Sequence, residues 1–95
     1  MFGIHDSFVK QCADFFPEEV VKLDVLQEEC AELIQALSKL KRGESGALDK
    51  VKEEMAHVLI SSAVVARAFG ITEADMEKEA NKKATKYNKN FKKGE

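Results

Sequence analysis

The feature that most constrains the fold is a regular spacing of apolar residues between residues 17 and 41. They recur at alternating intervals of three and four positions: Leu23, Leu26, Cys30, Leu33, Leu37 and Leu40. This spacing is a seam of a and d positions, which predicts a helix packed lengthwise on another helix. The sequence has no alternating apolar run and no Asn-Gly or Asp-Gly turn, so no strand is predicted. We therefore expect an all-α fold.

Glycine and proline divide the chain into four helical segments. Asp6 or Ser7 can cap a first short helix, and Pro17 suits the first turn of the next. Gly43 and Gly70 are expected to stop the second and third helices. Thr72 is expected to cap the fourth, which should fray at its end. The expected helices are a short one before Pro17 and longer ones at residues 17–41, 47–69 and about 72–90.

The apolar residues of the other helices predict how those helices pack. The third helix is apolar or small on nearly every side from Val58 to Ala66, which predicts a central position covered by its neighbours. The first helix should contribute core phenylalanines, and the fourth should present an inner face. The predicted core and inner-face positions are Phe8, Val9, Cys12, Phe15, Phe16, Ile71, Met76, Ala80, Lys83 or Ala84, and Tyr87.

Length and composition indicate one small soluble domain spanning residues 1–95. A chain this short buries a modest fraction of its surface, so oligomerisation is a natural way to enlarge the core. The net charge of −2 is too small to predict a nucleic-acid or membrane partner. With no secretory leader and no spanning segment expected, we predict a cytoplasmic protein. Cys12 and Cys30 belong to no C-x-x-C motif and are expected to be buried, reduced thiols.

Two residue pairs interrupt the apolar pattern. Glu29 and Glu32 are three positions apart, as are Glu54 and His57, so each pair shares one side of its helix. Glu29 and Glu32 are like-charged neighbours, which destabilises a helix unless a cation intervenes. Acids on helix surfaces are usually solvated, but these flank the apolar seam. If the two pairs face each other, they form an oxygen-rich pocket for a divalent cation.

A divalent cation between these residues would indicate a substrate that carries phosphate groups. Mg²⁺ takes oxygen ligands and serves enzymes that act on phosphates. Six lysines and no acid lie between Asn81 and Gly94. This basic stretch is either a solvated last helix or a patch that binds phosphate.

Residues 28–33 and 53–59, EECAEL and EEMAHVL, resemble the E-x-x-E … E-x-x-D signature of MazG-like nucleotide pyrophosphohydrolases, within the all-α NTP pyrophosphatase superfamily. The similarity covers about residues 20–90. It implies a four-helix MazG-like bundle completed by oligomerisation, as a dimer or a tetramer. It also implies Mg²⁺-dependent cleavage of a nucleoside triphosphate, often a deoxynucleotide, to the monophosphate and pyrophosphate. By motif position, the catalytic metal ligands would be Glu29, Glu32 and Glu54, and the lysines on substrate phosphate would be Lys83 and Lys86.

His57 departs from the family pattern, which has aspartate at this position. Imidazole suits Mn²⁺, Co²⁺ or Zn²⁺ better than Mg²⁺. His57 could therefore bind a softer metal, orient Glu54 or a water, contact phosphate, or mark a decayed site. Glu53 cannot replace the aspartate, because it points about 100° away from Glu54. Two alternative functions stay open: a phosphoribosyl-ATP pyrophosphatase-like enzyme, and a catalytically silent bundle that binds nucleotide or a protein partner.

Overall fold

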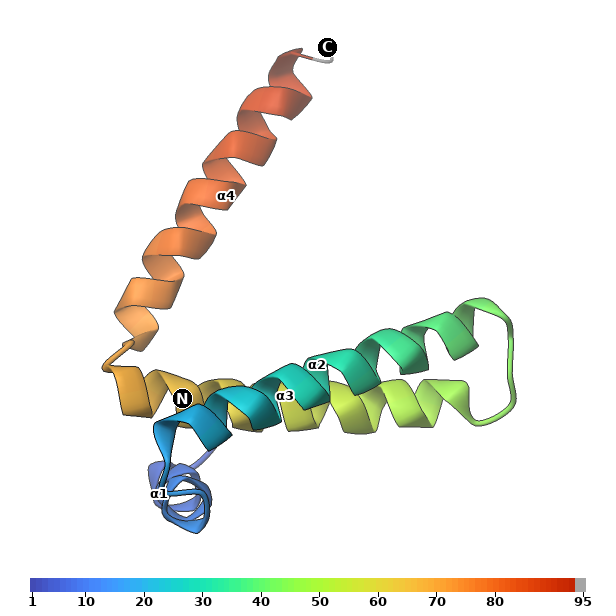
Figure 1. Ribbon diagram of the computed structural model, residues 1–95. Helices are drawn as coiled ribbons and strands as arrows, with labels where there is room; N and C mark the ends of the chain where they lie inside the picture. The colour runs from blue at the N-terminus through green and yellow to red at the C-terminus, as the bar shows by residue number, and fades with distance from the viewer. Residues whose placement is uncertain (94–95) are drawn as a thin grey trace.

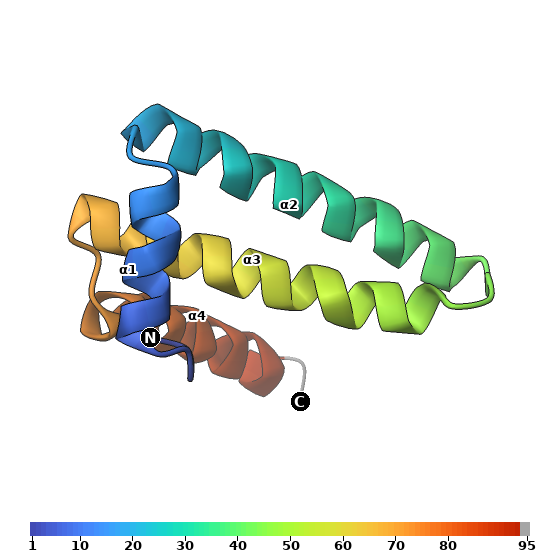
Figure 2. The same ribbon diagram turned by 90° about the horizontal axis from the view of Figure 1, so that it is seen from below.

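The computed structural model describes the backbone of residues 1–93 and the side chains of residues 1–88. This part of the chain has no strand and is all-helical, as predicted. Its elements are α1 (Asp6–Phe15), α2 (Glu19–Lys41), α3 (Ala47–Phe69) and α4 (Glu73–Lys93). Helices α2 and α3 form an antiparallel hairpin, and α1 crosses the hairpin near its open end (Figures 1 and 2).

The starts of the first two helices differ from the sequence prediction. The N-cap of α1 is His5, which makes no side-chain capping bond, rather than Asp6 or Ser7. The Asp6 carboxylate instead forms an ion pair with the Met1 ammonium, with Oδ1 and the nitrogen 3.6 Å apart. Helix α2 starts two residues after Pro17, because Glu18 is extended, with ψ of 132°, and acts as the N-cap.

The remaining helix ends follow the predicted punctuation. Gly43 and Gly70 have φ of +72° and +68°, a left-handed conformation that glycine adopts without steric cost. The expected capping box at the start of α4 is present. The Thr72 N–H donates to Asp75 Oδ2 at 2.9 Å, and the Asp75 N–H donates to Thr72 Oγ1 at 3.1 Å. These bonds hold the pKa of Asp75 below its ordinary value.

Helix α3 is central, as its composition predicted, because it packs on both α1 and α2. Its buried residues include Ala63, Val64 and Ala66, and Val64 joins Val9 of α1 in the core. The α2 seam is only half covered. Leu26 and Leu33 are partly buried, whereas Leu23 and Leu37 are 40% and 41% exposed. One side of α2 therefore packs on α3, and an adjoining apolar side faces solvent.

Helix α4 projects from the hairpin (Figure 1). Its attachment at the start includes a hydrogen bond from the Phe2 N–H to Glu73 Oε1 at 3.1 Å. The predicted inner face is wrong for a single chain: only Met76 is partly buried, and Ile71, Ala80, Lys83, Ala84 and Tyr87 are exposed. The radius of gyration is 16.3 Å, against about 12 Å for a compact chain of this length. The helix continues to Lys93, past the predicted end at Asn90. The fraying predicted after Asn90 is therefore not seen as far as Lys93. Residues 94–95 and the side chains of Lys89, Lys92 and Lys93 lie outside the described residues.

Two phenylalanines of α1 and one cysteine of α2 that were predicted to be buried are also exposed. Phe8 and Phe15 are 44% and 78% exposed, because α1 turns only one side towards α3. Cys30 is exposed on the uncovered side of α2, and Cys12 is partly buried. Both thiols are free. Among the described residues, no helix alone has the length and apolar character needed to cross a membrane; only α3 and the first part of α4, joined across a 115° bend, meet both limits together.

Candidate metal centre

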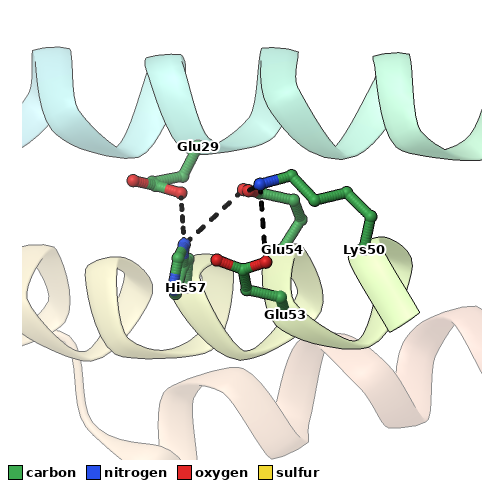
Figure 3. A network of polar contacts seen from close by, with 5 residues as sticks. All are labelled: Glu29, Lys50, Glu53, Glu54 and His57. Carbon is green, nitrogen blue, oxygen red and sulfur yellow. Dashed lines mark hydrogen bonds and ion pairs between the residues drawn. The ribbon is translucent and has the colours of Figure 1, made fainter. Parts of the chain in front are cut away.

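The two residue pairs singled out in the sequence face each other across the hairpin. Helix α2 supplies Glu29 and Glu32, and α3 supplies Glu54 and His57. One ligand atom from each of these four residues lies within 4.8 Å of those of the other three. Figure 3 shows Glu29 approaching Glu54 and His57 from the opposite helix. The antiparallel hairpin therefore produces the convergence that the spacing predicted. We call these four residues the metal cluster.

Glu54 is the most deeply buried member of the metal cluster, at 1% exposed. Its Oε1 forms an ion pair with Lys50 Nζ, which lies 3.2 Å away. Its Oε2 is buried without a hydrogen-bond partner in the described structure. Buried polar atoms are nearly always hydrogen-bonded, and a buried carboxylate oxygen without a partner is costly. This oxygen points into a group of other ligand atoms, so a cation there would satisfy it.

His57 links the two helices through its ring. Its Nδ1 lies 3.2 Å from Glu29 Oε2 and 3.7 Å from Glu54 Oε2. With the proton on Nδ1, His57 donates to Glu29; with Nδ1 deprotonated, the same atom is free to ligate a metal. The His57 and Glu29 side chains are 41% and 22% exposed, and Glu32 is exposed. The metal cluster is therefore buried at Glu54 and open to solvent on the side of Glu32 and His57.

The two facing glutamates titrate in opposite directions. Burial, together with the neighbouring carboxylate of Glu54, raises the pKa of Glu29 despite the nearby His57. Burial also opposes ionisation of Glu54, but the contact with the Lys50 ammonium outweighs it and lowers the pKa of Glu54. The two pKa shifts therefore favour protonation of Glu29 before Glu54. Glu54 stays a carboxylate, which is the form that binds metal.

Sequence reasoning missed Lys50. It lies one helical turn before Glu54, and the i, i+4 spacing of a lysine and a glutamate was the available signal. Its ammonium contacts Glu54 and also Glu53, whose Oε2 is 3.4 Å away (Figure 3). Glu53 is not one of the four converging ligand groups, although its carboxylate reaches the same ammonium as Glu54. Lys50 places a positive charge at the edge of the cluster.

The structure does not bring Lys83 and Lys86 to the metal cluster within one chain. Both are exposed on α4, which projects from the hairpin (Figure 1). Lys83 instead lies over the Tyr87 ring, with Nζ 5.7 Å from the centroid. If these lysines bind the substrate of a metal cluster, the cluster belongs to another chain.

The donor set fits a divalent cation. Three carboxylates and one imidazole are hard and borderline ligands, a combination that suits Mn²⁺ and also accommodates Mg²⁺ or Zn²⁺. The exposed side leaves room for ligands from solution. The arrangement could therefore hold one ion and present it to a phosphate-bearing molecule.

Comparisons with known proteins gave no match: no protein-family model, no curated protein and no solved structure is significantly similar to this chain.

Proposed function

We propose that this protein is a metal-dependent nucleoside triphosphate pyrophosphohydrolase of the MazG-like type, which releases a nucleoside monophosphate and pyrophosphate. The observation that carries the proposal is the buried, partnerless Oε2 of Glu54 inside a set of four convergent ligand groups. A buried carboxylate oxygen without a partner destabilises the folded protein, so we expect one only where a ligand satisfies it. The signature-like spacing of the same residues supports the choice of reaction.

Each residue of the metal cluster has a role in this proposal. Glu29, Glu32 and Glu54 would hold the ion, with His57 as the fourth ligand. A bound divalent ion would neutralise phosphate oxygens and activate water. Mg²⁺ is the ion that the motif implies, and His57 favours Mn²⁺. Lys50 keeps Glu54 ionised and adds positive charge where the phosphates of a substrate would approach.

The proposal includes a second copy of this chain as partner. By helical geometry, six of the exposed apolar positions of α2 and α3 lie on one side of the hairpin, roughly 100° round from the positions that face the other helix. Glu32 and His57 lie on the opposite side. Dimerisation would cover the apolar side and leave the metal cluster open. We call this side the apolar face; its residues are Leu23, Ile34, Leu37, Leu48, Met55 and Leu59, which are 40–64% exposed.

The test is a panel of ribonucleotides and deoxyribonucleotides, with phosphoribosyl-ATP included, assayed for pyrophosphate with Mg²⁺, Mn²⁺, Co²⁺ and Zn²⁺ in turn. We expect turnover of nucleoside triphosphates, and its loss in both Glu29→Gln and Glu54→Gln. Glu28→Gln is the matched control, because Glu28 is the exposed neighbour of Glu29. Thermal melting of each variant checks that it is folded.

Three outcomes of the panel would redirect the proposal. Turnover of phosphoribosyl-ATP alone would keep the metal chemistry and change the substrate. Metal binding without turnover of any nucleotide would indicate the catalytically silent bundle. Activity retained in both Glu29→Gln and Glu54→Gln would exclude the metal cluster as the active site.

A further inference from the structure

A lysine at the edge of the metal cluster is shared between two carboxylates that differ in their exposure to solvent. Lys50 Nζ lies 3.2 Å from Glu54 Oε1 and 3.4 Å from Glu53 Oε2 (Figure 3). The Glu54 side chain is 1% exposed, whereas the side chains of Lys50 and Glu53 are 51% and 53% exposed. Lys50 therefore links a buried member of the metal cluster to a solvated acid outside it.

The Lys50 ammonium lies where it opposes a bound cation. Within the described part of the chain, Lys50 is the one lysine or arginine that forms an ion pair with the metal cluster. It contacts Oε1 of Glu54, and Oε2 is the buried oxygen without a partner. A divalent ion held by Oε2 would share one carboxylate with the ammonium. Because like charges repel, the Lys50 charge weakens binding of that ion.

Glu53 offers the ammonium a second position. The contact between Lys50 and Glu53 already exists, so a shift of Nζ towards Glu53 needs only rotation at the exposed end of the lysine side chain. The shift keeps one ion pair and takes the positive charge away from Glu54. Glu53 should therefore reduce the repulsion that Lys50 exerts on a bound ion.

We propose that Lys50 and Glu53 together set the affinity of the metal cluster for its divalent ion. Lys50 is a positioning residue and not a ligand: it pairs with Glu54 when no ion is bound and with Glu53 when one is. Its charge makes the ion bind more weakly than the four ligand groups alone would hold it, so the ion can exchange. The inference rests on the metal binding that the proposed function requires, and it applies whatever substrate the ion meets.

The first test is calorimetric titration with Mn²⁺ at low salt and about pH 8, where glutamates are ordinarily ionised. Lys50→Met removes the charge and keeps the apolar stem. It should raise Mn²⁺ affinity about 10-fold, the effect of one unit charge on a divalent ion several ångströms away across a water-like dielectric. Lys50→Arg keeps the charge and should bind like the wild type. Lys52→Met is the matched control, because Lys52 is exposed and pairs with Asp49 instead, at 3.7 Å.

Two further readouts distinguish a charge effect from a change in packing. The difference between the wild type and Lys50→Met should shrink in about 0.5 M KCl, because salt screens exposed charges. A double-mutant cycle tests the role of Glu53. Glu53→Gln should weaken Mn²⁺ binding when Lys50 is present and have much less effect in the Lys50→Met background. Asp49→Asn removes an equal charge from the same helix and should act alike in both backgrounds.

The outcomes separate this inference from the proposed function. Tighter binding in Lys50→Met, with an effect of Glu53→Gln that depends on Lys50, supports the inference even if no nucleotide is hydrolysed. Unchanged or weaker binding in Lys50→Met that thermal melting shows to be folded overturns it and leaves the pyrophosphohydrolase proposal standing. So does an equal effect of Glu53→Gln in both backgrounds. A wild type that binds no divalent ion overturns both.

Discussion

Introducing one charge on the apolar face should separate the proposed dimer. Ile34 is 64% exposed in the single chain, so Ile34→Glu leaves the fold of that chain largely unaffected. Gln35, the next residue, lies on a side of α2 that is away from the apolar face. Gln35→Glu is therefore the matched control, because it introduces the same charge outside that face. The two variants therefore differ mainly in which side of α2 becomes charged.

The size of the effect follows from the surface of the chain. One chain exposes 7274 Å², against about 5,500 Å² for a compact protein of 10.6 kDa. If a dimer covered this difference in exposed surface on both copies, the interface would bury about 3,600 Å² in total. That area is in the range of permanent dimers. A two-fold dimer places the new carboxylate in the interface twice. Each unpaired buried charge costs several kcal/mol, so the dissociation constant should rise at least about 100-fold.

The assay is sedimentation equilibrium over a micromolar concentration series. The wild type and Gln35→Glu should have a mass of at least about 21 kDa, twice that of one chain, and Ile34→Glu should approach 10.6 kDa. A wild-type mass of 10.6 kDa throughout the series would refute the reasoning. So would an Ile34→Glu variant that associates as strongly as Gln35→Glu.

Three further predictions concern the metal cluster and the apolar face. His57→Asp should shift the metal preference from Mn²⁺ towards Mg²⁺ by removing the imidazole; unchanged relative affinities in calorimetry would show that His57 is not a ligand. The raised pKa of Glu29 means that protons compete with metal at a higher pH than for an ordinary glutamate of pKa 4.5. As the pH is lowered, Mn²⁺ affinity should therefore begin to fall at a higher pH than an ordinary glutamate would give, and a constant affinity over that range would contradict the assignment. Cys30, exposed on the uncovered side of α2, should react with a thiol reagent more slowly in the wild type than in Ile34→Glu; equal rates would place Cys30 outside the interface.

The helices and their order were predictable because local chemistry decides them. Gly43, Gly70 and the Thr72–Asp75 capping box mark helix ends whatever the tertiary structure is. The convergence of Glu29, Glu32, Glu54 and His57 was predictable too, because a short loop forces consecutive helices into an antiparallel pair.

The path of α4 and the state of the α2 seam could not be predicted. A seam such as that of Leu23 and Leu37 indicates that an apolar side will be covered, but not whether its own chain or another copy covers it. The same ambiguity made Cys30 look like a core residue. The burial of Lys22 and Ser61 was not predicted, because it depends on how α1 crosses the hairpin, which no local pattern specifies.

The central claim is that the four residues of the metal cluster bind a divalent ion. Calorimetric titration of the wild type and Glu54→Gln with Mn²⁺ tests it most directly, because Glu54 Oε2 is the buried oxygen that lacks a hydrogen-bond partner. We expect the wild type to bind one ion per chain and Glu54→Gln to lose that binding while remaining folded. A wild-type protein that binds no divalent ion, or a Glu54→Gln variant that binds as tightly as the wild type, would contradict the account.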